Sequence, residues 1–395
     1  SRMVAFDEIS DPKNDYNLNL PRYIDSTEPE DIQDIDGHLR GGIPERSLND
    51  LDAYWQAIPG LRDTLFENAG RPGYAQLRLP IGEVKSAILD HPEFAAFRET
   101  ATGIFDTWRS ANMARLKGFD RDGQPKELIA TISEELLDAF RAAALIDPYD
   151  AYQHLMDYWA ATMQDDCYLI AADGWVAETR RITEETKAGK LKDKGWACDL
   201  IPKPYIVARY FAEEQAKLDA LQAELDRTSA RLDELEEEHG GEDGAFSELE
   251  KIKAGEVKRR AKEIKADPDY ADERKILEEW LELDTERTTL KRKIKAAESA
   301  LDTLAYDKYP ELSVDEIKTL VVDDKWLDSL GTALQGELDR VSQTLTGRIR
   351  QLAERYATPL PELTLQVAAL EDKVAGHLEK MGFTMNAELI MENGE

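Results

Sequence analysis

Cysteine and long apolar runs are scarce in this sequence. Its 395 residues include two cysteines, Cys167 and Cys198, and neither belongs to a CxxC pair, so neither a zinc site nor a thioredoxin-like redox site is indicated. No apolar segment approaches the roughly 20 residues that span a bilayer, and residues 1–4 have neither the basic patch nor the apolar region of a signal peptide. We therefore expect a cytoplasmic chain without a membrane segment.

Motifs for catalysis and cofactor binding are also missing. The sequence has no GxGxxG or P-loop motif to cradle a nucleotide, no HExxH pair for metal catalysis and no GxSxG motif. Carboxylate pairs such as Asp165-Asp166 are common in so acidic a chain and are better explained as solvated surface. The sequence therefore predicts no catalytic residue, cofactor site or metal site. The five histidines are widely scattered, at His38, His91, His154, His239 and His377.

Acidic and apolar residues are plentiful instead. Asp and Glu total 81 against 50 Lys and Arg, which gives a net charge of −31. Such a charge repels the DNA backbone, so any DNA contact must be local or supplied by a partner. Hydrophobic residues make up 42% and charged residues 33% of the chain, a composition typical of a folded protein rather than a disordered one.

The spacing of apolar residues predicts a mainly α-helical fold with few short strands. Residues 1–50 hold four prolines and many Asn and Asp residues, which favours an extended connector with turns. Residues 51–204 are expected to form a mainly helical domain, because apolar positions recur at spacings of three and four. Short strands are expected at Tyr74–Leu79 and Cys167–Ala171.

Residues 205–305 predict a long antiparallel coiled-coil arm. A first heptad seam ends at His239-Gly240-Gly241, and a second follows Asp267-Pro268, a suitable N-cap and first helical residue. The sequence leaves open whether the chain turns at Pro268 or continues through it. The first seam comprises Val207, Phe211, Leu218, Leu221, Leu225, Thr228, Leu232 and Leu235, and the second comprises Ile276, Trp280, Leu283, Arg287, Leu290, Ile294, Ala297, Leu301 and Leu304.

Opposite charges along the arm allow two interpretations. Residues 213–238 hold ten acids and three bases, whereas residues 251–265 hold seven bases and two acids and residues 287–295 hold five bases and no acid. We favour pairing of these segments with one another. The alternative is contact with DNA phosphates, for which the candidates are Lys258, Arg259, Lys262, Lys291, Arg292 and Lys293.

Residues 306–395 predict a helical hairpin and a tail. Apolar residues from Leu327 to Tyr356 repeat in three blocks of 11, two prolines interrupt, and a 3,4 pattern resumes from Leu363 to Met381. Two helices alone leave part of their apolar surface exposed to water, so either the body of the chain or the helices of a partner must cover it. We therefore expect the hairpin to be the principal docking surface for partner helices, with Leu338, Val341, Leu345, Ile349, Leu352, Leu370 and Val374 as docking candidates.

One stretch near the start has a distinctive sequence, Asn14-Asp15-Tyr16-Asn17-Leu18-Asn19-Leu20-Pro21-Arg22-Tyr23. Its alternation of polar and apolar residues before a proline favours an extended, strand-like segment. It closely resembles the signature that follows the catalytic domain in methylase (M) subunits of type I restriction-modification enzymes. Residues 150–159 and 338–343 are similar to other parts of the longer family members, so the resemblance spans nearly the whole chain. The signature residues are Asn14, Asp15, Tyr16, Asn17, Asn19, Pro21, Arg22 and Tyr23.

The resemblance implies the carboxy-terminal assembly region of a DNA adenine-N6 methyltransferase subunit. In the family, an upstream domain binds S-adenosylmethionine, and an Asn-Pro-Pro-Phe/Tyr tetrapeptide holds the flipped adenine. This sequence has neither the tetrapeptide nor a glycine-rich cofactor motif, so no catalytic residue carries over. Residues 1–50 are then expected to follow a catalytic domain outside the sequence. The implied partners are the specificity (S) subunit, a second M subunit and the restriction (R) subunit, with DNA reached through the complex.

A second hypothesis comes from a different class of protein. The same acidic seams suit an independent coiled-coil protein that acts as a structural spacer or as a DNA mimic. An Asn-Pro-Pro-Phe/Tyr motif in the reading frame upstream of residue 1 would support the methylase hypothesis, whereas a start codon immediately upstream would support the second one.

We predict that this chain alone transfers no methyl group, because it lacks both the adenine-holding tetrapeptide and a cofactor loop. The measurement is incorporation of labelled methyl from S-adenosylmethionine into unmethylated DNA. Incorporation above a no-protein control would contradict the interpretation.

Overall fold

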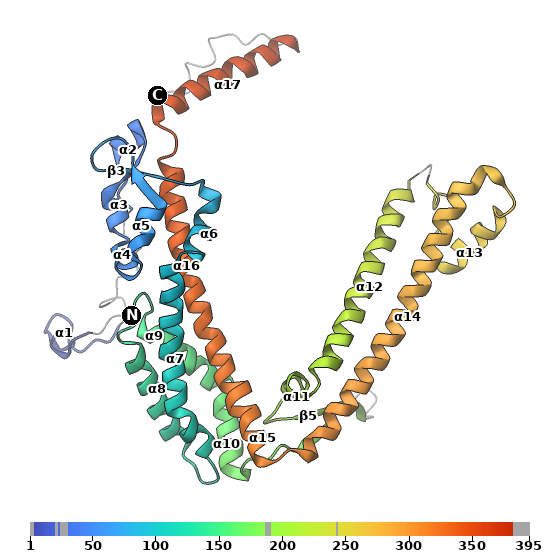
Figure 1. Cartoon of the computed structure of the whole chain (residues 1–395), viewed down its shortest axis with the longest axis horizontal. Coiled ribbons are helices and arrows are strands. Elements are labelled where there is room, and N and C mark those ends of the chain that lie inside the picture. The colour runs from blue at the N-terminus through green and yellow to red at the C-terminus, as the bar shows by residue number, and fades with distance from the viewer. Residues whose placement is uncertain (1–3, 20–22, 24–30, 186–190, 242–243, 382–395) are drawn as a thin grey trace. The chain divides into compact units, whose positions relative to one another are not determined.

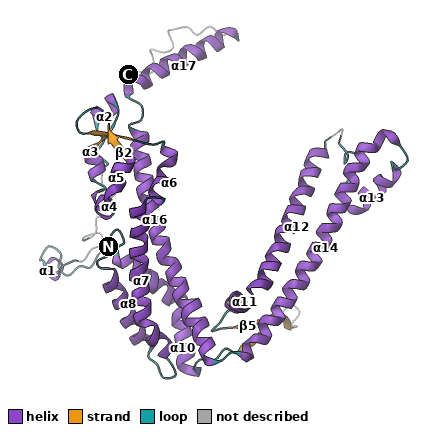
Figure 2. Cartoon of the chain, in the orientation of Figure 1, coloured by secondary structure: helices purple, strands orange, loops and turns teal. Residues whose placement is uncertain are grey.

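The computed structural model describes residues 4–19, 23, 31–185, 191–241 and 244–381. Helices predominate (Figure 2), which confirms the predicted mainly α-helical class. The chain forms two compact units, each from separate segments: unit 1 comprises residues 1–112, 126–161 and 330–395, and unit 2 comprises residues 113–125 and 162–329. These units do not coincide with the four consecutive segments predicted from the sequence.

Unit 1 combines a small sheet with several helices. The sheet is antiparallel in the order β1-β3-β2, and Ala75 of β3 pairs with both Ile43 and Asn68. β3 confirms the predicted strand at 74–79. The elements are α1 (Phe6–Ser10), α2 (Ile35–Arg40), β1 (Ile43–Pro44), α3 (Glu45–Asn49), α4 (Asp52–Ala57), α5 (Pro59–Leu65), β2 (Phe66–Asn68), β3 (Tyr74–Leu77), η2 (Ile81–Glu83), α6 (Val84–Leu89), most of α7 (Pro92–Gly118), α8 (Pro125–Phe140), α9 (Pro148–Tyr158), most of α16 (Asp328–Arg355) and α17 (Leu360–Lys380).

The core of unit 1 is built along α16. Its apolar positions between Leu330 and Tyr356 are buried, as the 11-residue repeat predicts for a helix covered on one face. Polar contacts fix the neighbouring helices on either side. Gln335 donates to Thr102 of α7 at 3.0 Å, and His154 Nε2 of α9 lies 2.8 Å from Glu337 Oε1. The covering helices therefore come from this chain itself.

The connector predicted for residues 1–50 is partly helical and is attached to the end of α16. Arg348 and Arg355 both donate to the carboxylate of Asp31, and these hydrogen bonds hold the pKa of that carboxyl below its ordinary value. The backbone N–H of Asp34 donates to the Tyr356 hydroxyl at 3.0 Å. No long helix occurs among the described residues of this region, as its prolines predicted, but α1, α2 and α3 interrupt the extended chain.

Unit 2 contains a β-hairpin, two π-helical segments and two long helices. The predicted strand at 167–171 is wrong, because these residues lie inside α10, which ends where Gly174 adopts a φ of 78°. The hairpin of β4 and β5 was not predicted. The elements are most of the segment from η3 (Trp159–Met163) through α10 (Gln164–Asp173), then β4 (Thr179–Glu185), β5 (Leu191–Cys198), α11 (Lys203–Tyr210), α12 (Ala212–His239), α13 (Ala254–Glu263), η4 (Pro268–Tyr270), α14 (Ala271–Lys308), η5 (Tyr309–Glu311), α15 (Val314–Lys318) and η6 (Thr319–Leu327).

Helices α12 and α14 lie side by side and antiparallel (Figure 1). Arg231 near the end of α12 donates to Glu279 near the start of α14 at 3.0 Å. At the opposite end of the pair, Lys203, which precedes α12, lies 2.7 Å from Asp302 near the end of α14. The antiparallel pairing predicted for residues 205–305 is therefore present. The chain turns at Pro268, where the Asp267 side chain accepts from the N–H of Asp269.

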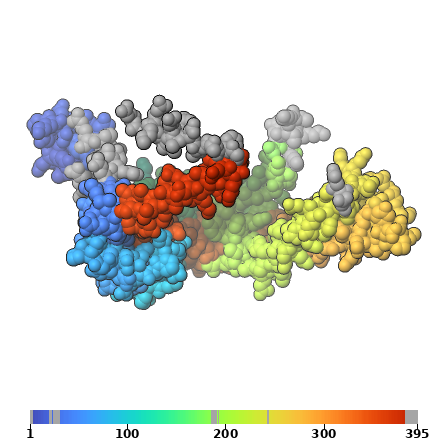
Figure 3. All heavy atoms as spheres, turned by 90° about the horizontal axis from the view of Figure 1, so that it is seen from above, coloured from blue at the N-terminus to red at the C-terminus, as the bar shows by residue number. Residues whose placement is uncertain are grey.

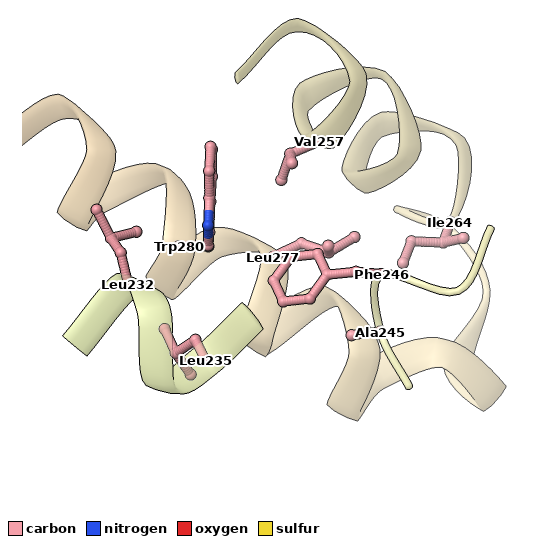
Figure 4. Packing of buried hydrophobic residues seen from close by; sticks show 8 residues of the cluster. All are labelled: Leu232, Leu235, Ala245, Phe246, Val257, Ile264, Leu277 and Trp280. Atoms are coloured by element: carbon pink, nitrogen blue, oxygen red, sulfur yellow. The ribbon is translucent and has the colours of Figure 1, made fainter. Parts of the chain in front are cut away.

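The far end of this helix pair has a hydrophobic core of its own, called here the tip core (Figure 4). Trp280 is 2% exposed, and its indole N–H donates to Glu236 at 2.9 Å. Helix α13 folds back onto α14 and contributes Val257. The tip core therefore ties α12, α13 and α14 together. Its buried members are Leu232, Leu235, Ala245, Phe246, Val257, Ile264, Leu277 and Trp280.

We predict that Trp280→Ala destabilises the tip core by about 3–5 kcal/mol, because it leaves a large cavity and removes the donor to Glu236. Hydrogen exchange should become faster in residues 244–264 and remain unchanged in α16. Leu304→Ala on the same helix is the control, since Leu304 is 42% exposed. Equal acceleration in α16 would show that the tip core does not unfold separately.

Candidate functional site

The docking candidates on α16 are interior residues. Leu345, Ile349 and Leu352 are completely buried, and Leu338 and Val341 are nearly so. The pattern of apolar residues was correct, but helices of the same chain cover the face that we expected a partner to cover. The prediction that these five residues form an accessible docking surface is therefore wrong.

The docking candidates on α17 are exposed. Leu370 is 60% exposed and Val374 is 54% exposed, and no residue of α17 is buried. The second helix of the predicted hairpin is thus present but does not bury its apolar face against the first. Figure 3 shows the atoms of α17, in red, uncovered on the side that it presents.

The apolar residues of α17 lie mainly along one side of the helix. Positions 363, 367, 370, 374, 378 and 381 fall within about 80° of one another at 100° per residue. We call Leu363, Val367, Leu370 and Val374, which are 43–60% exposed, the α17 seam. Leu365 lies on the opposite side of the helix and is 72% exposed. Four neighbouring apolar side chains on one side of α17 are therefore open to solvent.

The signature stretch is a compact turn where it is described. Asp15 and Tyr16 have positive φ values of 47° and 55°, and the N–H of Tyr16 donates to the carbonyl of Ile9. The extended conformation predicted here is therefore wrong for residues 12–16. Tyr23 is buried, and its hydroxyl donates to the carbonyl of Asn17 at 2.6 Å. The Asn14 side chain donates to the carbonyl of Glu8, and the backbone N–H of Asn19 donates to the Asn17 side chain. Pro21 and Arg22 lie outside the described residues.

Residues 150–159 and 338–343 contact each other within unit 1. Arg340 bridges Asp150 and Glu337, with its Nη2 2.6 Å from Asp150 Oδ2. Burial alone would raise the pKa of Glu337, but hydrogen bonds from His154 and Arg340 hold it below its ordinary value. Asp150, His154, Glu337 and Arg340 thus form a polar network that links α9 to α16.

The candidate phosphate-binding residues do not pair with the acidic helix. Among the described residues, Arg231 with Glu279 is the ion pair that joins α12 to α14, and its cation is on the acidic helix. The acidic segment nevertheless packs against both basic segments, because α12 lies along α14 and Leu232 and Leu235 share the tip core with Val257 and Ile264. The favoured interpretation, pairing of these segments with one another, agrees with this packing, although it is not made by ion pairs of the six candidates. All six candidates are exposed: Lys258, Arg259, Lys262, Lys291, Arg292 and Lys293.

A buried ion pair in unit 2 was missed by sequence reasoning. Lys325 in η6 donates to Asp166 in α10 and to the carbonyl of Leu200, both at 2.8 Å, and Trp326 donates to the other Asp166 oxygen. Asp166 and Lys325 are 3% and 4% exposed. Burial raises the pKa of Asp166, and the Lys325 ammonium opposes this rise. The partners are 159 positions apart, so no local spacing could have indicated them.

We predict that Asp166→Asn or Lys325→Met alone lowers the free energy of unfolding by about 3–5 kcal/mol, because each leaves a buried charge or donor without its partner. The double variant should lose less stability than the sum of the losses in the two single variants. Urea denaturation followed by tryptophan fluorescence measures this, since Trp175 and Trp326 lie close together in unit 2. Additive losses would contradict the proposed coupling.

A cleft of about 460 Å³ lies beside the β-hairpin of unit 2. The two arginines that line the cleft already have partners within the chain. Arg180 donates to Asp199 through two nitrogens, and Arg121 donates to the carbonyl of Asp173. In the part of the chain that the structure describes, no group of three His, Cys, Asp or Glu residues is placed to hold a metal ion. No described helix is both long and apolar enough to cross a membrane.

Comparisons with known proteins identify no relative. No family model, no curated protein and no solved structure matches this chain.

Proposed function

We propose that this chain is the carboxy-terminal assembly region of the M subunit of a type I restriction-modification DNA adenine-N6 methyltransferase. In this proposal, α17 is the helix that docks the S subunit. The chain supports S-adenosylmethionine-dependent methylation by holding the complex together and supplies no catalytic or cofactor-binding residue. The family resemblance supplies the identity of the partner, and the exposed seam of α17 is the observation that carries the assembly role.

Physical chemistry favours a helical partner for α17. A 21-residue helix gains little stability from its own hydrogen bonds in water, and most helices in proteins depend on the burial of one apolar face. The α17 seam repeats at intervals of four, three and four residues, which is the spacing that lets two helices interlock. A partner helix laid along this seam would cover the residues that unit 1 leaves exposed.

We predict that Val367→Asp with Leu370→Asp lowers affinity for the S subunit by roughly 100-fold or more. Buried apolar anchors are typically worth about 2 kcal/mol or more each, and each 1.4 kcal/mol is a factor of ten. Because neither residue is buried in the chain itself, circular dichroism should be unchanged. Capture is measured by titrating labelled chain with the purified S subunit from the same operon.

Leu365→Asp is the matched control, since it places the same charge on the opposite side of α17 and should leave capture intact. Unchanged capture by the double variant would place docking elsewhere. If the chain alone is a dimer that the double variant dissociates without loss of S-subunit capture, the seam serves a second copy and the proposal fails.

A further inference from the structure

The tip of the helix pair presents five lysines to solvent. Lys251, Lys253, Lys258, Lys262 and Lys265 are all exposed, and within the described ranges none of their ammonium groups forms an ion pair or hydrogen bond. We call these five residues the tip lysines. They lie within a stretch of 15 residues that holds seven bases and two acids, whereas the net charge of the whole chain is −31, so the sign of the charge is reversed in this stretch.

Three acidic residues close to the tip lysines, Glu256, Glu263 and Glu273, are held by arginines instead. Arg259 lies 2.6 Å from Glu256 and 3.7 Å from Glu263, the two acids of α13. Arg260 lies 2.7 Å from Glu273 at the start of α14. The arginines of α13 thus neutralise these three carboxylates and leave the ammonium groups of the lysines available for another anion.

The tip core fixes the direction in which α13 presents its charges. Val257 and Ile264 on the inner side of α13 are buried against the tip core (Figure 4). Lys258 and Lys262 are one helical turn apart and lie about 100–140° around the helix from Val257. The lysine-bearing side is therefore held outward by packing on the opposite side.

We propose that the tip lysines bind the phosphate backbone of duplex DNA without reading its sequence. Counterion release makes phosphate contact favourable for exposed lysines alone, and lysine acts as a point charge rather than a bidentate reader. A membrane-surface helix needs a free apolar side, and that of α13 is used in the tip core. Protein interfaces are depleted of lysine and rely on aromatic or apolar anchors. This contact does not depend on docking by α17.

The other basic candidates are less suited to such a contact. Lys291, Arg292 and Lys293 are consecutive on α14, so their side chains point in directions about 100° apart. Lys293 also lines a groove with Glu224, Glu282 and Glu286. These three residues therefore provide a control with the same change of charge.

The test compares two triple variants of the full chain in fluorescence anisotropy with a labelled duplex, between about 50 and 200 mM salt. Lys258→Gln with Lys262→Gln and Lys265→Gln should weaken binding at least roughly tenfold at low salt and reduce the log–log salt slope by about 3. Lys291→Gln with Arg292→Gln and Lys293→Gln should leave both quantities unchanged. Arg in place of Lys at 258, 262 and 265 should restore binding.

The proposal fails if the unaltered chain shows no measurable DNA binding, if the two Gln variants lose binding equally, or if Arg does not restore the binding that Gln removes. Binding to phosphatidylserine vesicles or to polyglutamate as tight as binding to DNA would also overturn it, by assigning the tip lysines to a membrane or an acidic protein. Circular dichroism of each variant verifies that the helices are intact.

Discussion

An amphipathic helix needs something to cover its apolar face, and this requirement determines how the long helices of the chain are arranged. In unit 1, α7 and α9 bind α16 while its apolar side is buried. At the far end of the α12–α14 pair, α13 and the preceding residues complete the tip core. Helix α17 has the same kind of apolar repeat, but no described residue of the chain buries it.

Charge has a different role from apolar burial in this chain. Individual ion pairs join segments that are distant in sequence. Asp31 pairs with Arg348, and Asp166 pairs with Lys325. Exposed pairs of this kind contribute little, whereas the buried pair makes each partner depend on the other. The large excess of acidic residues repels nucleic acid over most of the chain. The tip lysines are a local exception to this repulsion.

Much of the fold could be predicted from the sequence because the long helices carry strong periodicity. The repeat of α16 and the termination of α12 at Gly240 are local signals, and both were interpreted correctly. Short apolar runs are ambiguous, so residues 167–171 were assigned to a strand although they belong to α10. The turn at Tyr16 requires a positive φ, which tyrosine rarely adopts, and no local sequence pattern predicts this turn.

The docking surface could be predicted only in part, for a related reason. The seams of α16 and α17 have similar spacing, and the sequence does not say which of them the chain itself will cover. Leu345 and Leu370 therefore looked equivalent, but the first is buried and the second is 60% exposed. Tertiary contacts made by α7 and α9 decide between them. Such contacts join residues too far apart in the chain for a pattern of three and four to reveal.

The most direct measurement of the central claim is hydrogen exchange along α17, in the chain alone and with the S subunit. We expect fast exchange at residues 360–380 in the chain alone, because no residue of this helix is buried. Binding of the S subunit should slow exchange there and leave α16 unchanged. Exchange in α17 that is already slow without a partner, or that stays fast when the S subunit is bound, would contradict the account.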